Sequence, residues 1–102
     1  MTDRELLEAA AKAAGIELVP GTKRLKNITG IAVWNPLDDD GDALRLAVKL
    51  KLEIDISNNG IAARTQRGEK ILIEVKEKDC AYAATRSAIV RAAASLAPKE
   101  TT

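Results

Sequence analysis

Residues 52 to 76 read LEIDISNNGIAARTQRGEKILIEVK and predict three β-strands joined by tight turns. In residues 52–56 apolar and acidic side chains alternate with the period of two that a half-buried strand shows. An Asn-Asn-Gly turn leads into a return strand over residues 61–66, and an Arg-Gly-Glu turn leads into a third strand over residues 71–76. The segment therefore predicts an antiparallel meander.

The third strand contains three successive apolar residues, Ile71, Leu72 and Ile73. An edge or half-exposed strand alternates more cleanly, so we expect this strand at the centre of a sheet that is buried on both faces. On that expectation, replacing Leu72 or Ile73 with alanine costs about 2–4 kcal/mol of unfolding free energy.

The segment before the meander predicts a helix followed by less regular structure. A capping-box pattern at residues 2–5 starts a helix that Gly15 ends. Residues 16–19 then predict a short strand and residues 20–30 a loop or loose hairpin, after which the chain extends again over residues 31–34.

Two more helices complete the pattern of elements. One spans roughly residues 40–51, and the other runs from a capping Asp79 to about Ala97, before a polar tail over residues 98–102 that we expect to be disordered. The order of helix, one or two strands, helix, three strands and helix predicts a single α+β domain over residues 1–102. In it, helices flank an antiparallel sheet in an α/β/α sandwich.

Composition sets the class of protein. The chain has 102 residues, of which 46% are hydrophobic and 30% charged, as in an ordinary globular domain with one core. Trp34 and Tyr82 are its only aromatic residues, so aliphatic side chains and alanine must fill the core. A net charge of +1 provides no overall attraction to nucleic acid or to a membrane.

Cysteine use and the opening residues point to a cytoplasmic protein. Cys80 is alone, so it cannot form an internal disulfide. The amino terminus is polar, and no apolar run approaches the length of a membrane span.

Residues 34–45 read WNPLDDDGDALR and join the tryptophan to four aspartates. Aspartates before a helical run typically accept hydrogen bonds from the free amides of the first turn, so we expect Asp38 or Asp39 to cap the helix. Asp42 is placed to pair with Arg45 one turn later.

The same aspartates have an alternative interpretation as a divalent-metal loop. A calcium loop has glycine in sixth position and glutamate in twelfth. Placing Gly41 sixth puts Pro36 first and Ala47 last, and neither side chain can bind a cation. We therefore expect no metal site.

Residue content also argues against catalysis. There is no histidine, which removes the commonest general base and the usual nucleophile pairs. Gly60 and Gly68 belong to separate turns, so no phosphate-binding glycine motif is present. Cys80 begins a helix, where free amides can activate a thiol, but no partner residue or second cysteine accompanies it, so we expect an inert, partly buried thiol. We expect no enzymatic activity and no cofactor.

Binding residues are sought instead among side chains in unusual positions. Arg86 falls between Tyr82 and apolar helix positions, where it forms either a structural ion pair or an anchor for an anion or a protein. Trp34 is either a core plug or an interface anchor. The candidate binding residues are Trp34, Asn35, Asp39, Asp40, Asp42, Arg45 and Arg86.

Two basic groups bear on nucleic-acid binding. Lys23, Arg24 and Lys26 form the first, and Arg64 and Arg67 form the second. Single-stranded nucleic acid is usually bound by stacking aromatic residues beside such cations, and neither group contains one. Solvated surface is therefore the expected role of both groups.

Four segments carry a resemblance to a known family. They are WNPL at 34–37, DDGDALRLAV at 39–48, ATR at 84–86 and AIVRAA at 88–93. The chain resembles, over its whole length, the phage ABA-sandwich domain family of small phage and prophage proteins. The resemblance implies an α/β/α layered fold and a phage origin, and it implies no activity or catalytic residues. Asp38 departs from the hydroxyl residue expected there.

These observations lead to two functional hypotheses. The first is a non-enzymatic phage or prophage accessory protein that binds another protein in the bacterial host cytoplasm. A second copy of the same chain is also a candidate partner. The alternative is a small nucleic-acid or nucleotide-binding module that uses the basic turns and Arg86.

Overall fold

The computed structural model describes residues 2–18, 33–58, 60–74 and 80–97, which form three helices and a three-stranded antiparallel sheet. The helices are α1 (Asp3–Ala14), α2 (Asp40–Leu50) and α3 (Ala81–Ser95), and the strands are β1 (Glu53–Ile56), β2 (Gly60–Arg64) and β3 (Lys70–Glu74). These elements confirm the α+β class, the meander and the association of the sheet with helices.

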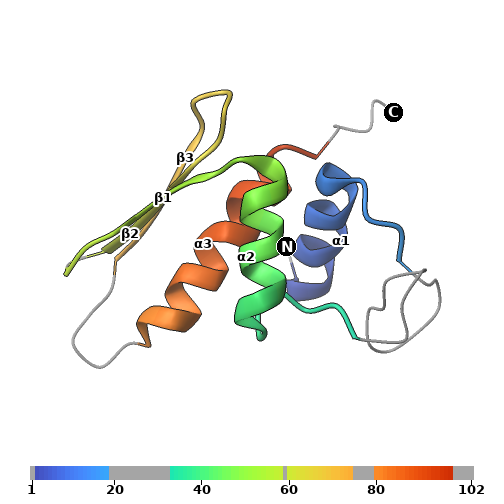
Figure 1. Ribbon diagram of the computed structural model, residues 1–102, viewed down its shortest axis with the longest axis horizontal. Helices are drawn as coiled ribbons and strands as arrows, with labels where there is room; N and C mark the ends of the chain where they lie inside the picture. The colour runs from blue at the N-terminus through green and yellow to red at the C-terminus, as the bar shows by residue number, and fades with distance from the viewer. Residues whose placement is uncertain (1, 19–32, 59, 75–79, 98–102) are drawn as a thin grey trace.

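Helix α3 occupies the middle of the molecule. It packs against β2 and β3 on one side and against α1 and α2 on the other, so the sheet and α1 lie on opposite sides of it (Figure 1). Its small residues Ala88 and Ala92 are fully buried against Ile61 and Ala63 of β2. Alanine lets the backbones of helix and sheet approach closely, which compensates for the absence of large aromatic side chains in the core.

A second cluster of buried residues joins the three helices. Val90 and Ala93 of α3 meet Leu7 of α1 and Leu46 of α2, all of them at most 7% exposed. Trp34 belongs to the same cluster. Most of the core therefore lies between helices, and the sheet contributes the smaller part.

The predicted start of α1 is confirmed in detail. The hydroxyl oxygen of Thr2 accepts a hydrogen bond from the Glu5 amide at 3.1 Å, and the Thr2 amide donates to Glu5 Oε1 at 3.2 Å. The hydrogen bonds from the Thr2 backbone and side chain lower the pKa of Glu5. Gly15 ends α1 in the left-handed conformation, with φ of 70°, and its amide donates to the carbonyls of Ala11 and Lys12.

The segment after α1 differs from the predicted strand. Within residues 16–18 the structure has no strand, and Leu18 is a single β-bridge position, as is Val33. Val19, residues 20–30 and the tail at 98–102 lie outside the described residues.

The start of α3 also differs by one residue from the prediction. Cys80 occupies the N-cap position without a side-chain cap hydrogen bond, and Asp79 lies outside the described residues. Cys80 is exposed, so the expectation of a partly buried thiol is wrong.

The predicted central position of the third strand is wrong. The sheet order is β1-β2-β3, so β2 is central and β3 is at an edge. The register places Ile71 beside Ala63 and Ile73 beside Ile61, on the face toward α3. Leu72 therefore points to the opposite face, where it is 71% exposed.

The expectation of a sheet buried on both faces is wrong for the same reason. Asp55, Ala62 and Leu72 form one row across the outer face, and the described helices all lie on the other side (Figure 1). The run of three apolar residues in β3 consists of one exposed leucine between two isoleucines that face α3.

None of the helices in the described ranges combines the length and apolar character needed to cross a bilayer.

Alanine substitutions should separate the core from the outer face of the sheet. Leu46, 1% exposed, lies between helices, so we expect Leu46→Ala to lower the unfolding free energy by about 3 kcal/mol through lost burial and a residual cavity. Leu72→Ala should change it by less than about 0.5 kcal/mol. Urea denaturation monitored by circular dichroism measures both, and equal losses in the two variants would contradict the assigned layers.

Candidate functional site

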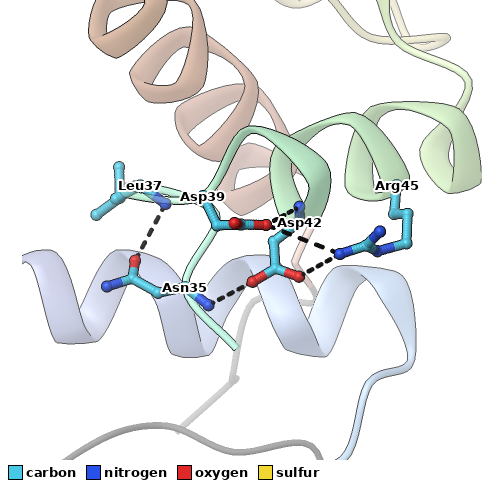
Figure 2. A network of polar contacts seen from close by, with 5 residues as sticks. All are labelled: Asn35, Leu37, Asp39, Asp42 and Arg45. Atoms are coloured by element: carbon cyan, nitrogen blue, oxygen red, sulfur yellow. Dashed lines mark hydrogen bonds and ion pairs between the residues drawn. The ribbon is translucent and has the colours of Figure 1, made fainter. Parts of the chain in front are cut away.

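The loop that enters α2 is organised around Asn35. The side-chain oxygen of Asn35 accepts a hydrogen bond from the Leu37 amide at 3.1 Å (Figure 2). Its backbone carbonyl accepts from the amides of Asp38 and Asp39 at 3.1 and 2.8 Å. The intervening Pro36 is fully buried. Because the asparagine satisfies three successive amides, the loop forms a tight turn that fixes where α2 begins.

Asp39 caps α2, as one of the two predicted capping residues. Its Oδ2 accepts a hydrogen bond from the amide of Asp42 at 2.7 Å, and its backbone carbonyl accepts from Ala43 at 3.0 Å. Asp38 instead accepts a bond from the Asn35 side chain at 3.2 Å. The interpretation of the acidic segment as a helix entrance is thereby confirmed.

Asp42 connects the turn to the helix surface. One carboxylate oxygen accepts from the Asn35 amide at 2.9 Å, and the other accepts from the Arg45 guanidinium at 2.7 Å (Figure 2). The predicted pair of Asp42 and Arg45 is thus present. The side chain of Asp42 is 14% exposed and that of Arg45 is 74% exposed, so the arginine lies mainly in solvent.

Arg86 fastens this loop to α3. Its Nε donates to the carbonyl of Leu37 at 2.8 Å, and its Nη1 donates to Asp40 Oδ1 at 2.6 Å. The side chain of Arg86 is 16% exposed and that of Asp40 is 66% exposed. The structural ion pair that was one alternative for Arg86 is present, but it is not the buried pair that was expected, because the Asp40 carboxylate is largely exposed.

Trp34 is 7% exposed and lies in the cluster between the helices. The structure thus confirms it as a core plug. Because Trp34 is buried, it is not available on the surface as an interface anchor for a partner.

Two carboxylates of the loop, those of Asp39 and Asp42, lie at 3.8 and 2.7 Å from Nη2 of Arg45, which is a cation already supplied by the fold (Figure 2). Asp39 faces the Asp42 amide, Asp42 faces Asn35 and Arg45, and Asp40 faces Arg86. Within the described ranges no three acidic, cysteine or histidine side chains are grouped as a metal site would require.

The basic groups are placed separately. Arg64 is 4.0 Å from Glu53 across the sheet, and Arg67 donates to the carbonyl of Leu96 at 3.4 Å, near the end of α3. Lys23, Arg24 and Lys26 lie outside the described residues. Two of the arginines assigned to nucleotide binding, Arg67 and Arg86, therefore make contacts within the fold.

An apolar groove lies between α2 and the first turns of α3, and it was not predicted. Its volume is about 470 Å³. Asp40 and Arg86 provide the charged groups in its wall, and the Thr85 hydroxyl donates to the Ala81 carbonyl at 2.7 Å. The groove is lined by Asp40, Ala43, Leu44, Ile56, Ala81, Tyr82, Thr85, Arg86 and Ile89.

Several large apolar side chains around this groove face solvent. Leu44 and Ile56 are each 63% exposed, Tyr82 is 71% exposed, and Val48, one turn after Leu44, is 68% exposed. The sequence contains a sign of this surface. The helix α2 has more apolar residues than its buried arc uses, and Leu44 and Val48 are the two in excess, spaced by four residues.

Comparisons with protein-family models, curated proteins and solved structures found no match.

Removal of the cap should weaken the fold without involving a metal. Asp39→Ala leaves the Asp42 amide without its acceptor, so we expect a loss of about 1 kcal/mol in unfolding free energy. Thermal denaturation with and without millimolar calcium measures the loss of stability and any effect of the ion on the melting temperature. Asp38→Ala, which leaves the cap in place, is the control. A rise in the melting temperature with calcium that Asp40→Ala and Asp42→Ala abolish would restore the metal-loop interpretation.

Alanine variants of Arg86 and Arg45 should show how much each arginine contributes to the stability of the fold. Arg86→Ala removes the donor of the Leu37 carbonyl and the partner of Asp40, so we expect a loss of about 1.5–3 kcal/mol. Arg45→Ala removes an exposed pair and should cost less than about 0.5 kcal/mol. Urea denaturation gives both values. A larger loss of unfolding free energy for Arg45→Ala than for Arg86→Ala would mean that the exposed pair with Asp42 stabilises the loop more than the contacts of Arg86 do.

Proposed function

We propose that this chain is a non-enzymatic binding protein whose groove between α2 and α3 receives an apolar segment of a protein partner. The observation that carries the proposal is the exposure of Leu44, Ile56 and Tyr82 around one hollow. Single exposed apolar residues are common on soluble proteins, but a contiguous patch around a concavity is typical of an interaction site.

The shape of this surface supports a protein partner. Leu44 of α2 lines the groove, and the exposed Val48 follows it one turn later on the same helix. Apolar anchors that insert between packed helices are a common mode of peptide and helix recognition. Covering this surface would remove large apolar side chains from water, which is the main favourable contribution to protein association.

The polar groups around the groove support binding rather than catalysis. Arg86 donates to Asp40, and Thr85 donates to its own helix. The Arg86 guanidinium stays protonated and the Thr85 hydroxyl is engaged by its own helix, so neither side chain is suited to act as a general acid or base.

The setting is proposed from the sequence resemblance. The segment from Trp34 to Leu37 and the start of α2 favour an accessory protein of a phage or prophage, and the partner would then be a protein of the bacterial host cytoplasm. We place nucleic-acid binding second, because Arg67 and Arg86 are engaged within the fold.

Affinity purification from bacteria that carry the phage or prophage tests this function. We expect the tagged chain to recover a specific protein, and an untagged copy of the chain itself counts as such a protein. The purified chain and the purified partner should then bind each other directly. Leu44→Glu places a charge beside the groove and should weaken this binding at least about 30-fold, or roughly 2 kcal/mol.

Leu72→Glu is the matched control and should leave binding unchanged, because Leu72 is similarly exposed but lies on the outer face of the sheet. Binding that both variants reduce equally would place the site elsewhere. A gel-shift assay at two salt concentrations is run in parallel. Salt-sensitive binding of nucleic acid, with no recovered protein, would favour the alternative function.

A further inference from the structure

Helix α2 presents a stripe of exposed side chains next to the groove. Asp40, Leu44 and Val48 are spaced by four residues, so they share about a quarter of the helix circumference at 3.6 residues per turn. Lys51 directly follows α2 as its C-cap, in the left-handed conformation with φ of 53°. Leu44 is 63% and Val48 is 68% exposed, and Asp40 and Lys51 are exposed as well. The stripe is therefore acidic at its start, apolar in its middle and basic at its end.

Such a stripe is complementary to an antiparallel copy of itself. With a twofold axis midway between Leu44 and Val48, each Leu44 faces Val48 of the other copy. Each Asp40 then lies near Lys51 of the other copy, which pairs opposite charges at both ends. Arg86 holds Oδ1 of Asp40, and among the described residues no partner holds Oδ2.

From this complementarity we infer that the occupant of the groove is a second copy of this chain, in a twofold dimer with antiparallel α2 helices. The inference rests on the proposed function, since it names the partner of the same groove. Twofold dimers with self-complementary patches are the commonest form of protein oligomer.

The geometry of the groove agrees with this arrangement. The hollow lies beside the stripe, between Leu44 on one side and Ile56 and Tyr82 on the other. A helix packed on α2 at the usual separation of about 8–10 Å would lie over this hollow and place its own Val48 against the Leu44 that lines it. One contact would thus cover the stripe and the groove of both copies.

The available area is sufficient for a dimer of moderate affinity. Leu44, Val48, Ile56 and Tyr82 are 63–71% exposed, and together they present roughly 500 Å² of surface per copy. Two copies with their polar margins would bury about 1,200 Å², the lower limit for specific interfaces. The net charge of +1 per chain opposes association only weakly.

Sedimentation velocity of the purified full-length chain gives the first test. We expect a dimer at about 100 µM chain, which is above the micromolar dissociation constant of an interface of this size. Val48→Glu and Leu44→Lys should each be monomeric, with dissociation constants raised at least about 100-fold. Leu72→Glu should remain dimeric, and circular dichroism should show the same helix content in all three variants.

Mixing the two monomeric variants tests the antiparallel register. In a mixed dimer of Val48→Glu with Leu44→Lys, the new glutamate faces the new lysine at one contact. At the other contact, the original leucine faces the original valine. The equimolar mixture should therefore form a heterodimer at concentrations where each variant alone is monomeric. A parallel pairing gives no such rescue, because position 48 would then face position 48.

The outcomes separate this inference from the proposed function. A wild-type chain that stays monomeric at about 100 µM, but binds another protein in a manner that Leu44→Glu abolishes, overturns the dimer and leaves the proposed function intact. A dimer that survives Val48→Glu, or a mixture that stays monomeric, overturns the antiparallel α2 interface. A monomer that binds no protein overturns both.

Discussion

The close approach of α3 to its neighbours on both sides is the constraint on which this structure depends. A helix that contacts a sheet and two other helices must be covered by small residues where the backbones come nearest. Ala88 and Ala92 serve that role toward β2, and Ala93 serves it toward α1, all with no exposed surface. Larger side chains there would separate the layers and open the core, because protein interiors tolerate little added volume.

The acidic loop shows how polar residues can determine geometry without performing chemistry. Asn35 closes the turn, Asp39 begins α2, and Arg86 connects the turn to α3. Each carboxylate in this network has a donor within the fold, so its charge stabilises the local structure. The same network fixes the position of α2 relative to α3, and that position creates the groove between them.

The groove is where the molecule leaves apolar surface uncovered. Its walls come from α2, α3 and β1, which the core packs together, so the hollow is present in the monomer. A rigid apolar surface binds at low conformational cost, because few side chains lose freedom on association. The exposed charges along α2 run from acidic at its start to basic after its end. A partner helix with the same order pairs opposite charges only when it lies antiparallel, so the charges favour one orientation of the partner.

The sequence alone determined those features that depend on neighbours along the chain. The capping box at Thr2, the glycine at 15, a capping aspartate at 38 or 39 and the pair of Asp42 with Arg45 all act within four residues of one another. Strand periodicity similarly predicted the meander. Local hydrogen bonds and side-chain spacing suffice for such features, since their geometry is set before the elements pack.

The tertiary structure decided everything that depends on which faces meet. Alternation within β3 could not show that β2 would be central, because strand order is set by pairing between strands and by the position of α3. The exposure of Leu72 follows from that order. The contact from Arg86 to Leu37 spans 49 positions, and the groove joins β1, α2 and α3. A surface built from segments so far apart has no periodicity in the sequence, because it exists only once the segments are packed together.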